Sequence, residues 1–161
     1  MENTPLGKII KNYASNKFTL EQIMSHFVKL TSTESSELRE KYISKFVGDE
    51  SIYLKYKIDT EPSTYLWNSF RSNVTSMDIN ELTNNFPLSN HLFMFWDYNS
   101  ANHPMFNLGR EFVFKISSEQ LLNNYLKFPS DTYFFDESFE STLLITHEDF
   151  NYDVQQFLLL K

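Results

Sequence analysis

The segment His91–Tyr98, read HLFMFWDY, constrains the fold more than any other stretch of this chain. Strand alternation divides its apolar side chains into two rows, one on each face: Phe93 and Phe95, and Leu92, Met94 and Trp96. A strand that is apolar on both faces is stable only where the sheet is covered on both sides. The sequence therefore predicts a central strand inside a two-sided core.

Three later segments also have strand-like patterns. In 110–116, REFVFKI, one row is apolar (Phe112, Phe114 and Ile116), and Val113 is an apolar residue on the outer side. The runs 131–136, DTYFFD, and 141–148, STLLITHE, are rich in β-forming residues and are separated by a short loop at 137–140. This spacing is typical of a β-hairpin.

Capping patterns predict the helices. Thr19 and Gln22 form a capping box for a helix whose apolar stripe runs to Leu30, and a second helix is expected from near Ser35 to Gly48. Shorter helices are expected after Pro62 and through Ile79 and Leu82. Ser117 and Gln120 form another capping box, for a helix that packs on the sheet and ends by Pro129. The final stretch, 151–161, favours a helix.

These patterns together predict an α+β fold, with N-terminal helices followed by a largely antiparallel sheet of about four strands and one helix packed on it. The length of 161 residues suits about one domain, and no repeat, low-complexity tract or long linker divides the chain. We therefore expect a single domain over 1–161. With 17% aromatic and 22% charged residues, the composition is typical of a folded chain.

Composition excludes several classes of chemistry. Without cysteine the chain has no disulfide, thiol nucleophile or cysteine-based zinc site, and its three glycines form no phosphate-binding loop. We expect no cofactor and no bound metal. No apolar run approaches the ~20 residues that span a bilayer, and the N-terminus has no targeting pattern. The expected location is the cytoplasm, without a membrane partner.

The negative charge is concentrated in the second half of the chain. Residues 1–60 hold nine basic and eight acidic side chains, whereas residues 61–161 hold five and thirteen, which gives the net charge of -7. Seven acids follow one another without a basic residue: Asp131, Asp136, Glu137, Glu140, Glu148, Asp149 and Asp153. This acid run is either a solvated face or a surface for a basic partner. Direct nucleic-acid binding is not expected, because phosphates require a clustered basic surface.

One set of residues has the chemistry of a metal or acid/base site: Asp97, His103, His147 and Glu148. These imidazoles and carboxylates would meet only if the loop after Trp96 folded over the strand end. In the alternative interpretation His147 is structural, because it continues the strand row of Leu143 and Ile145 and ends it with a ring hydrogen bond.

Four segments in order resemble a family of small uncharacterised bacterial proteins: LREKYISKF, YLWNSF at Tyr65–Phe70, HLFMFWDY, and DTYFFDESFESTLLITHE, which ends at Glu148. The family pattern runs from a helix through Y-L-W-H-x-F to an aromatic strand, and it closes with a hairpin that carries Asp-x-Tyr, Asp and Thr-His-Glu. The resemblance covers roughly residues 37–148. This chain has Asn68 where the pattern has His, and Ser141 with Thr142 where it has a Trp-Thr pair, so no role of that His carries over.

The family is similar to the immunity proteins whose genes neighbour those of bacterial toxins. The resemblance and the acid run lead to one expectation: a cytoplasmic immunity protein, not an enzyme, that inhibits the C-terminal nuclease domain of a toxin. The seven acids of the acid run would contact this basic partner. The alternative is a small metal-dependent or acid/base enzyme centred on Asp97, His103, His147 and Glu148.

Overall fold

The computed structural model describes residues 27–47, 66–70, 75–85, 89–97, 108–146 and 157–160. Within these residues the strands are β1 (Val28–Lys29), β2 (Thr75–Met77), β3 (His91–Trp96), β4 (Phe114–Ser117), β5 (Thr132–Phe135), β6 (Thr142–Ile145) and β7 (Phe157–Leu160). The helices are α3 (Ser32–Phe46), α5 (Ile79–Asn85) and α6 (Ser118–Asn124), and the 3-10 turns are η1 (Leu66–Ser69) and η3 (Tyr125–Lys127).

The described strands form one antiparallel sheet in the order β1-β4-β3-β5-β6-β7-β2. The predicted α+β class is confirmed. The sheet has seven strands instead of about four, because the short strands β1 and β2 extend its two edges and β7 adds a further strand. The helix predicted for 151–161 is wrong over Phe157–Leu160, where the backbone pairs with β6 on one side and β2 on the other.

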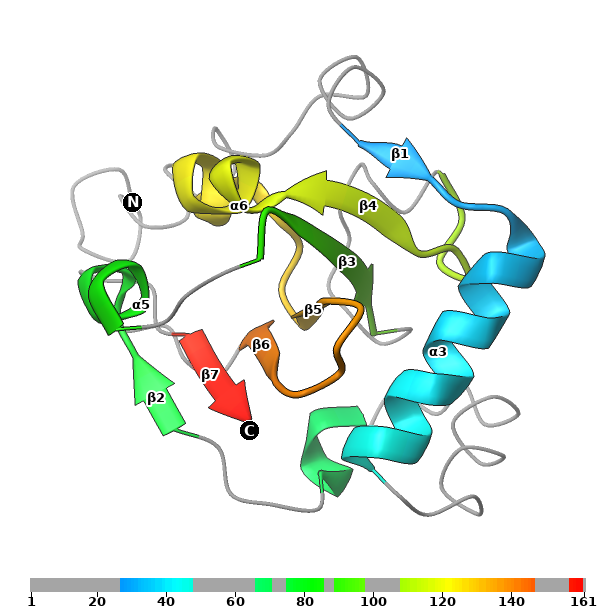
Figure 1. Ribbon diagram of the computed structural model, residues 1–161, viewed down its shortest axis with the longest axis horizontal. Coiled ribbons are helices and arrows are strands. Elements are labelled where there is room, and N and C mark those ends of the chain that lie inside the picture. Colours follow the sequence, from blue (N-terminus) through cyan, green and yellow to red (C-terminus); the bar gives the residue numbers. More distant parts are fainter. Residues whose placement is uncertain are drawn as a thin grey trace, which may run out of the picture.

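Strand β3 separates two hydrophobic clusters, as its alternation predicts. Leu92, Met94 and Trp96 pack in the cluster that α5 and α6 cover through Leu82 and Leu121. The opposite cluster contains Phe93 and Phe95 and is covered by α3 through Tyr42, Ile43 and Phe46. Figure 1 shows α3 on one side of the sheet and α5 and α6 on the other. Val113, expected on the outer side of its segment, is fully buried in the α3 cluster.

Helix α3 begins earlier than the sequence suggested. Its N-cap is Thr31, whose side-chain oxygen accepts a 3.2 Å hydrogen bond from the Glu34 amide, while the Glu34 carboxylate accepts one of 2.9 Å from the Thr31 amide. These reciprocal bonds satisfy two N–H groups that would otherwise lack a partner. The hydrogen bonds from the backbone and side chain of Thr31 lower the pKa of Glu34. Tyr42 and Phe46 of this helix are buried.

The helix predicted from Thr19 lies mostly outside the described residues, but its last turn is wrong. Val28 and Lys29 form β1, and the Leu30 amide donates a 3.0 Å hydrogen bond to the Val113 carbonyl. This backbone therefore pairs with the edge of β4 and belongs to the sheet. Of the helix predicted after Pro62, the described residues include only the 3-10 turn η1.

The predictions of α5, of the start of α6 and of the β-hairpin are confirmed, whereas the strand predicted at 110–116 forms only from Phe114, as β4. Helix α5 spans the expected apolar positions, and α6 begins with the predicted capping box of Ser117 and Gln120. Strands β5 and β6 form the predicted hairpin, with Thr132 opposite Ile145 and Phe135 opposite Thr142. Among the described helices, none has both the length and the apolar character needed to cross a bilayer.

Candidate functional site

Residues 136–140, which belong to the loop between β5 and β6, contain three carboxylates of the acid run and are called here the acidic loop. Its first residue organises it. Oδ1 of Asp136 accepts hydrogen bonds from the Ser138 amide at 2.9 Å and from the Ser138 hydroxyl at 2.5 Å. The Ser138 hydroxyl oxygen in turn accepts a 3.1 Å hydrogen bond from the Glu140 amide. These local bonds fold the loop back on itself.

Phe139 ties the acidic loop to the body of the protein. Its backbone has a φ of 52°, in the left-handed region that non-glycine residues rarely adopt, and its side chain is only 4% exposed. The ring packs against Phe135 with centroids 5.2 Å apart, and the Lys41 ammonium of α3 lies 4.6 Å from the ring centroid. Burial of this one ring compensates for the unfavourable backbone and fixes the loop's position.

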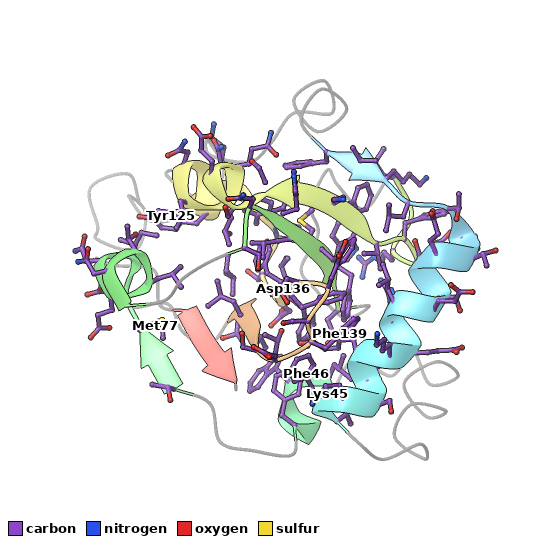
Figure 2. All side chains as sticks on the ribbon, in the orientation of Figure 1. Lys45, Phe46, Met77, Tyr125, Asp136 and Phe139 are labelled. Carbon is purple, nitrogen blue, oxygen red and sulfur yellow. The ribbon has the colours of Figure 1, made fainter. Side chains whose placement is uncertain are left out.

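The three carboxylates of the acidic loop have different environments. Glu137 and Glu140 are exposed, whereas Asp136 is half-buried and also accepts a hydrogen bond from the Ser89 hydroxyl. Burial acts to raise the pKa of Asp136, but the hydrogen bonds from Ser138 and Ser89 outweigh it and lower the pKa below its ordinary value of 3.8. The ionised form of Asp136 is therefore favoured. Figure 2 shows Asp136 and Phe139 on this loop.

Asp131 is not available to a partner, which corrects the prediction that it belongs to the binding surface. Its side chain is 1% exposed, and Oδ1 accepts a 3.2 Å hydrogen bond from the indole N–H of Trp67. The backbone has a φ of 59°, which aspartate tolerates better than most residues. Asp131 is thus part of the fold. The other predicted contact residues, Glu148, Asp149 and Asp153, lie outside the described residues.

Asp97, the first member of the predicted metal or acid/base set, is completely buried at the end of β3. Its Oδ2 accepts a 2.8 Å hydrogen bond from the Leu66 amide and one of 2.9 Å from the Tyr133 hydroxyl. This carboxylate therefore holds η1 against the sheet. The other three members, His103, His147 and Glu148, lie outside the described residues. Within the described ranges, no three His, Asp or Glu side chains gather as metal ligands would.

Two features of this region were missed by reasoning from the sequence. One is the buried polar network that links Asp97, Asp131, Tyr133 and Trp67; its only sequence signal is the pair of aspartates beside otherwise apolar strands. The other is the internal bonding of the acidic loop. The Asp-x-Ser spacing of Asp136 and Ser138 is typical of a side chain that bonds the backbone two residues on, and it could have predicted this turn.

No protein-family model, no curated protein and no solved structure matches this chain. The resemblance to the family of small bacterial proteins therefore stays a prediction.

Proposed function

We propose that this protein is a cytoplasmic immunity protein that binds and inhibits the C-terminal domain of a bacterial toxin. The acidic loop forms the core of the contact, through Glu137 and Glu140. The partner surface is basic, and a nuclease domain is the partner class that best fits this charge. Nucleases must present a basic cleft to the phosphates of their substrate, so an acidic loop seated in that cleft excludes the nucleic acid.

The observation that carries the proposal is an exposed acidic loop that is held in one conformation by its own hydrogen bonds and by a buried ring. Ordering a solvated loop costs conformational entropy. This loop is nevertheless ordered, by its own hydrogen bonds and by the buried Phe139. A loop ordered before binding loses less conformational entropy when a partner immobilises it. The carboxylates also attract a basic partner from a distance and raise the association rate.

Asp136 has a supporting role in this proposal. Three hydrogen bonds from Ser138 and Ser89 occupy its oxygens, so it contributes negative potential and holds the loop, while its neighbours make the direct contacts. The contact surface is therefore smaller than the acid run, and it excludes Asp131.

The proposal expects the gene directly upstream to encode a toxin, and the experiment uses the C-terminal domain of that toxin. The two proteins are produced together, and the complex is measured by size-exclusion chromatography and calorimetry. We expect a 1:1 complex that abolishes nuclease activity, and weaker binding when Glu137 and Glu140 are both changed to Lys. If the two purified proteins form no complex at low salt, the proposed function is wrong.

A further inference from the structure

A depression of about 280 Å³ lies beside the acidic loop, on the α3 side of the sheet. Residues 89–91 and Phe93 line it from β3 and the turn before it, Lys115 lines it from β4, and residues 136–138 line it from the acidic loop. The hydrogen bond from the Ser89 hydroxyl to Asp136 joins two of these walls, although 47 residues separate them in sequence. The depression is therefore a built feature and not a gap between independent loops.

The floor of the depression is aromatic. Phe93 is 9% exposed, which makes it the most accessible apolar side chain of β3, and its strand neighbours Met94 and Phe95 are fully buried. Its ring packs on Phe135 with centroids 5.5 Å apart, so its position is fixed. Lys115 lies directly opposite Phe93 in the β3–β4 register.

The walls carry charges of both signs. Among the described residues, no hydrogen bond or ion pair occupies the Glu137 carboxylate or the Lys115 ammonium. Asp136 adds a second negative charge, but its own chain already supplies three hydrogen bonds to it. Glu137 is therefore the carboxylate of the depression that can receive new donors.

We propose that this depression binds an arginine side chain of the partner, an inference that rests on the proposed function. A guanidinium is planar and stacks on an aromatic ring, and its donors form a fork that matches a carboxylate. Here Phe93 supplies the ring, and Glu137 supplies the carboxylate. The remaining donors can bond to Asn90 and Asp136, and Lys115 can donate to the backbone carbonyl of the same arginine. A lysine side chain would use only part of this arrangement.

The first test needs no toxin. The ¹⁵N-labelled protein is titrated with N-acetyl-arginine amide and followed by NMR, with N-acetyl-lysine amide and N-acetyl-citrulline amide as comparisons. We expect the arginine derivative to shift the amides of Phe93, Lys115 and Glu137, with a Kd of about 1–10 mM. The lysine derivative should bind more weakly, and the uncharged citrulline derivative should cause no shifts. Equal shifts with citrulline, or none with arginine up to about 50 mM, would overturn the proposal.

Two matched variants identify the site. Glu137→Gln removes the free carboxylate of the depression and should raise the Kd for the arginine derivative about tenfold, as for the loss of a charge-assisted hydrogen bond. Glu140→Gln removes an exposed carboxylate of the same loop that does not line the depression, and it should leave the Kd unchanged. If the two variants raised the Kd equally, binding of the arginine derivative would depend only on the total negative charge of the loop, and the proposal would be wrong.

Binding to the toxin domain distinguishes a failure of this inference from a failure of the proposed function. If the complex forms but Glu137→Gln and the wild type bind the toxin domain equally well, the arginine site is wrong and the proposed function stands. If the arginine derivative binds as expected but no toxin complex forms, the site stands and its partner is another basic protein.

Discussion

The Tyr133 hydroxyl donates a 2.9 Å hydrogen bond to Asp97, and both residues are completely buried. The same oxygen of Asp97 accepts from the Leu66 amide, and the Tyr133 hydroxyl oxygen accepts from the Trp67 amide at 3.1 Å. The first amides of a helical turn have no partner within the turn. Two side chains from the sheet therefore supply the acceptors that hold η1 in place.

Replacing Tyr133 with Phe should lower the free energy of unfolding by about 1–3 kcal/mol. The change removes one donor to the buried Asp97 and leaves the Trp67 amide without this acceptor, while the aromatic packing is kept. Urea denaturation followed by circular dichroism measures the effect. As a control, Ser36→Ala on the exposed face of α3 should change stability by less than about 0.5 kcal/mol. A similarly small effect of Tyr133→Phe would contradict the structural role of this hydroxyl.

Reversing the charge of the exposed acids should slow association with the toxin domain. Glu137→Lys combined with Glu140→Lys leaves Asp136 in place, so the loop keeps its internal hydrogen bonds. At low salt the association rate should fall at least about tenfold, because long-range attraction is replaced by repulsion. The difference should shrink near 1 M salt, where the screening length is about 3 Å. Stopped-flow kinetics at several salt concentrations measure it.

The matched control changes the net charge equally at other places. Glu37→Lys on α3 combined with Glu119→Lys on α6 reverses two exposed acids outside the acidic loop. This variant should associate nearly as fast as the wild type. If both double variants slow association equally, only the net charge matters and the acidic loop is a solvated face.

Asp136 should make stability depend on pH in the acid range. Its pKa is lower in the folded protein than the ordinary 3.8, so the ionised carboxylate stabilises the fold above about pH 4. That contribution is lost as the pH falls through the folded-state pKa. Asp136→Asn should therefore be less stable than the wild type at pH 7, and the difference should diminish by pH 3. A difference that stays constant from pH 7 to pH 3 would show that ionisation of Asp136 does not matter.

Removing the N-cap of α3 should destabilise the protein measurably. Thr31→Ala removes the side-chain oxygen that accepts from the Glu34 amide, and such changes typically cost about 1 kcal/mol. Thr33→Ala, in the same first turn but exposed and not at the cap position, is the control. Thermal unfolding should show a lower Tm for Thr31→Ala only. Equal Tm values for the two variants would be inconsistent with a stabilising cap.

Local patterns in the sequence determined much of the fold. The alternation in His91–Trp96 predicted a central strand between two clusters, and Ser117 with Gln120 predicted the start of α6. The β5–β6 hairpin followed from two β-forming runs with a short loop. These predictions succeed because capping and alternation involve residues only a few positions apart, so their physical causes can be read within one short segment.

Tertiary structure alone decided the edges of the sheet and the fate of the buried acids. Residues 157–160 became a strand because β6 and β2 lie on either side of them, and residues 28–29 did so because β4 offers an open edge. Asp131 looks like its acidic neighbours in sequence, yet it is buried by an indole 64 residues away, while Glu137 remains in solvent. A carboxylate is buried only where donors are brought to it, and the folded chain alone brings them.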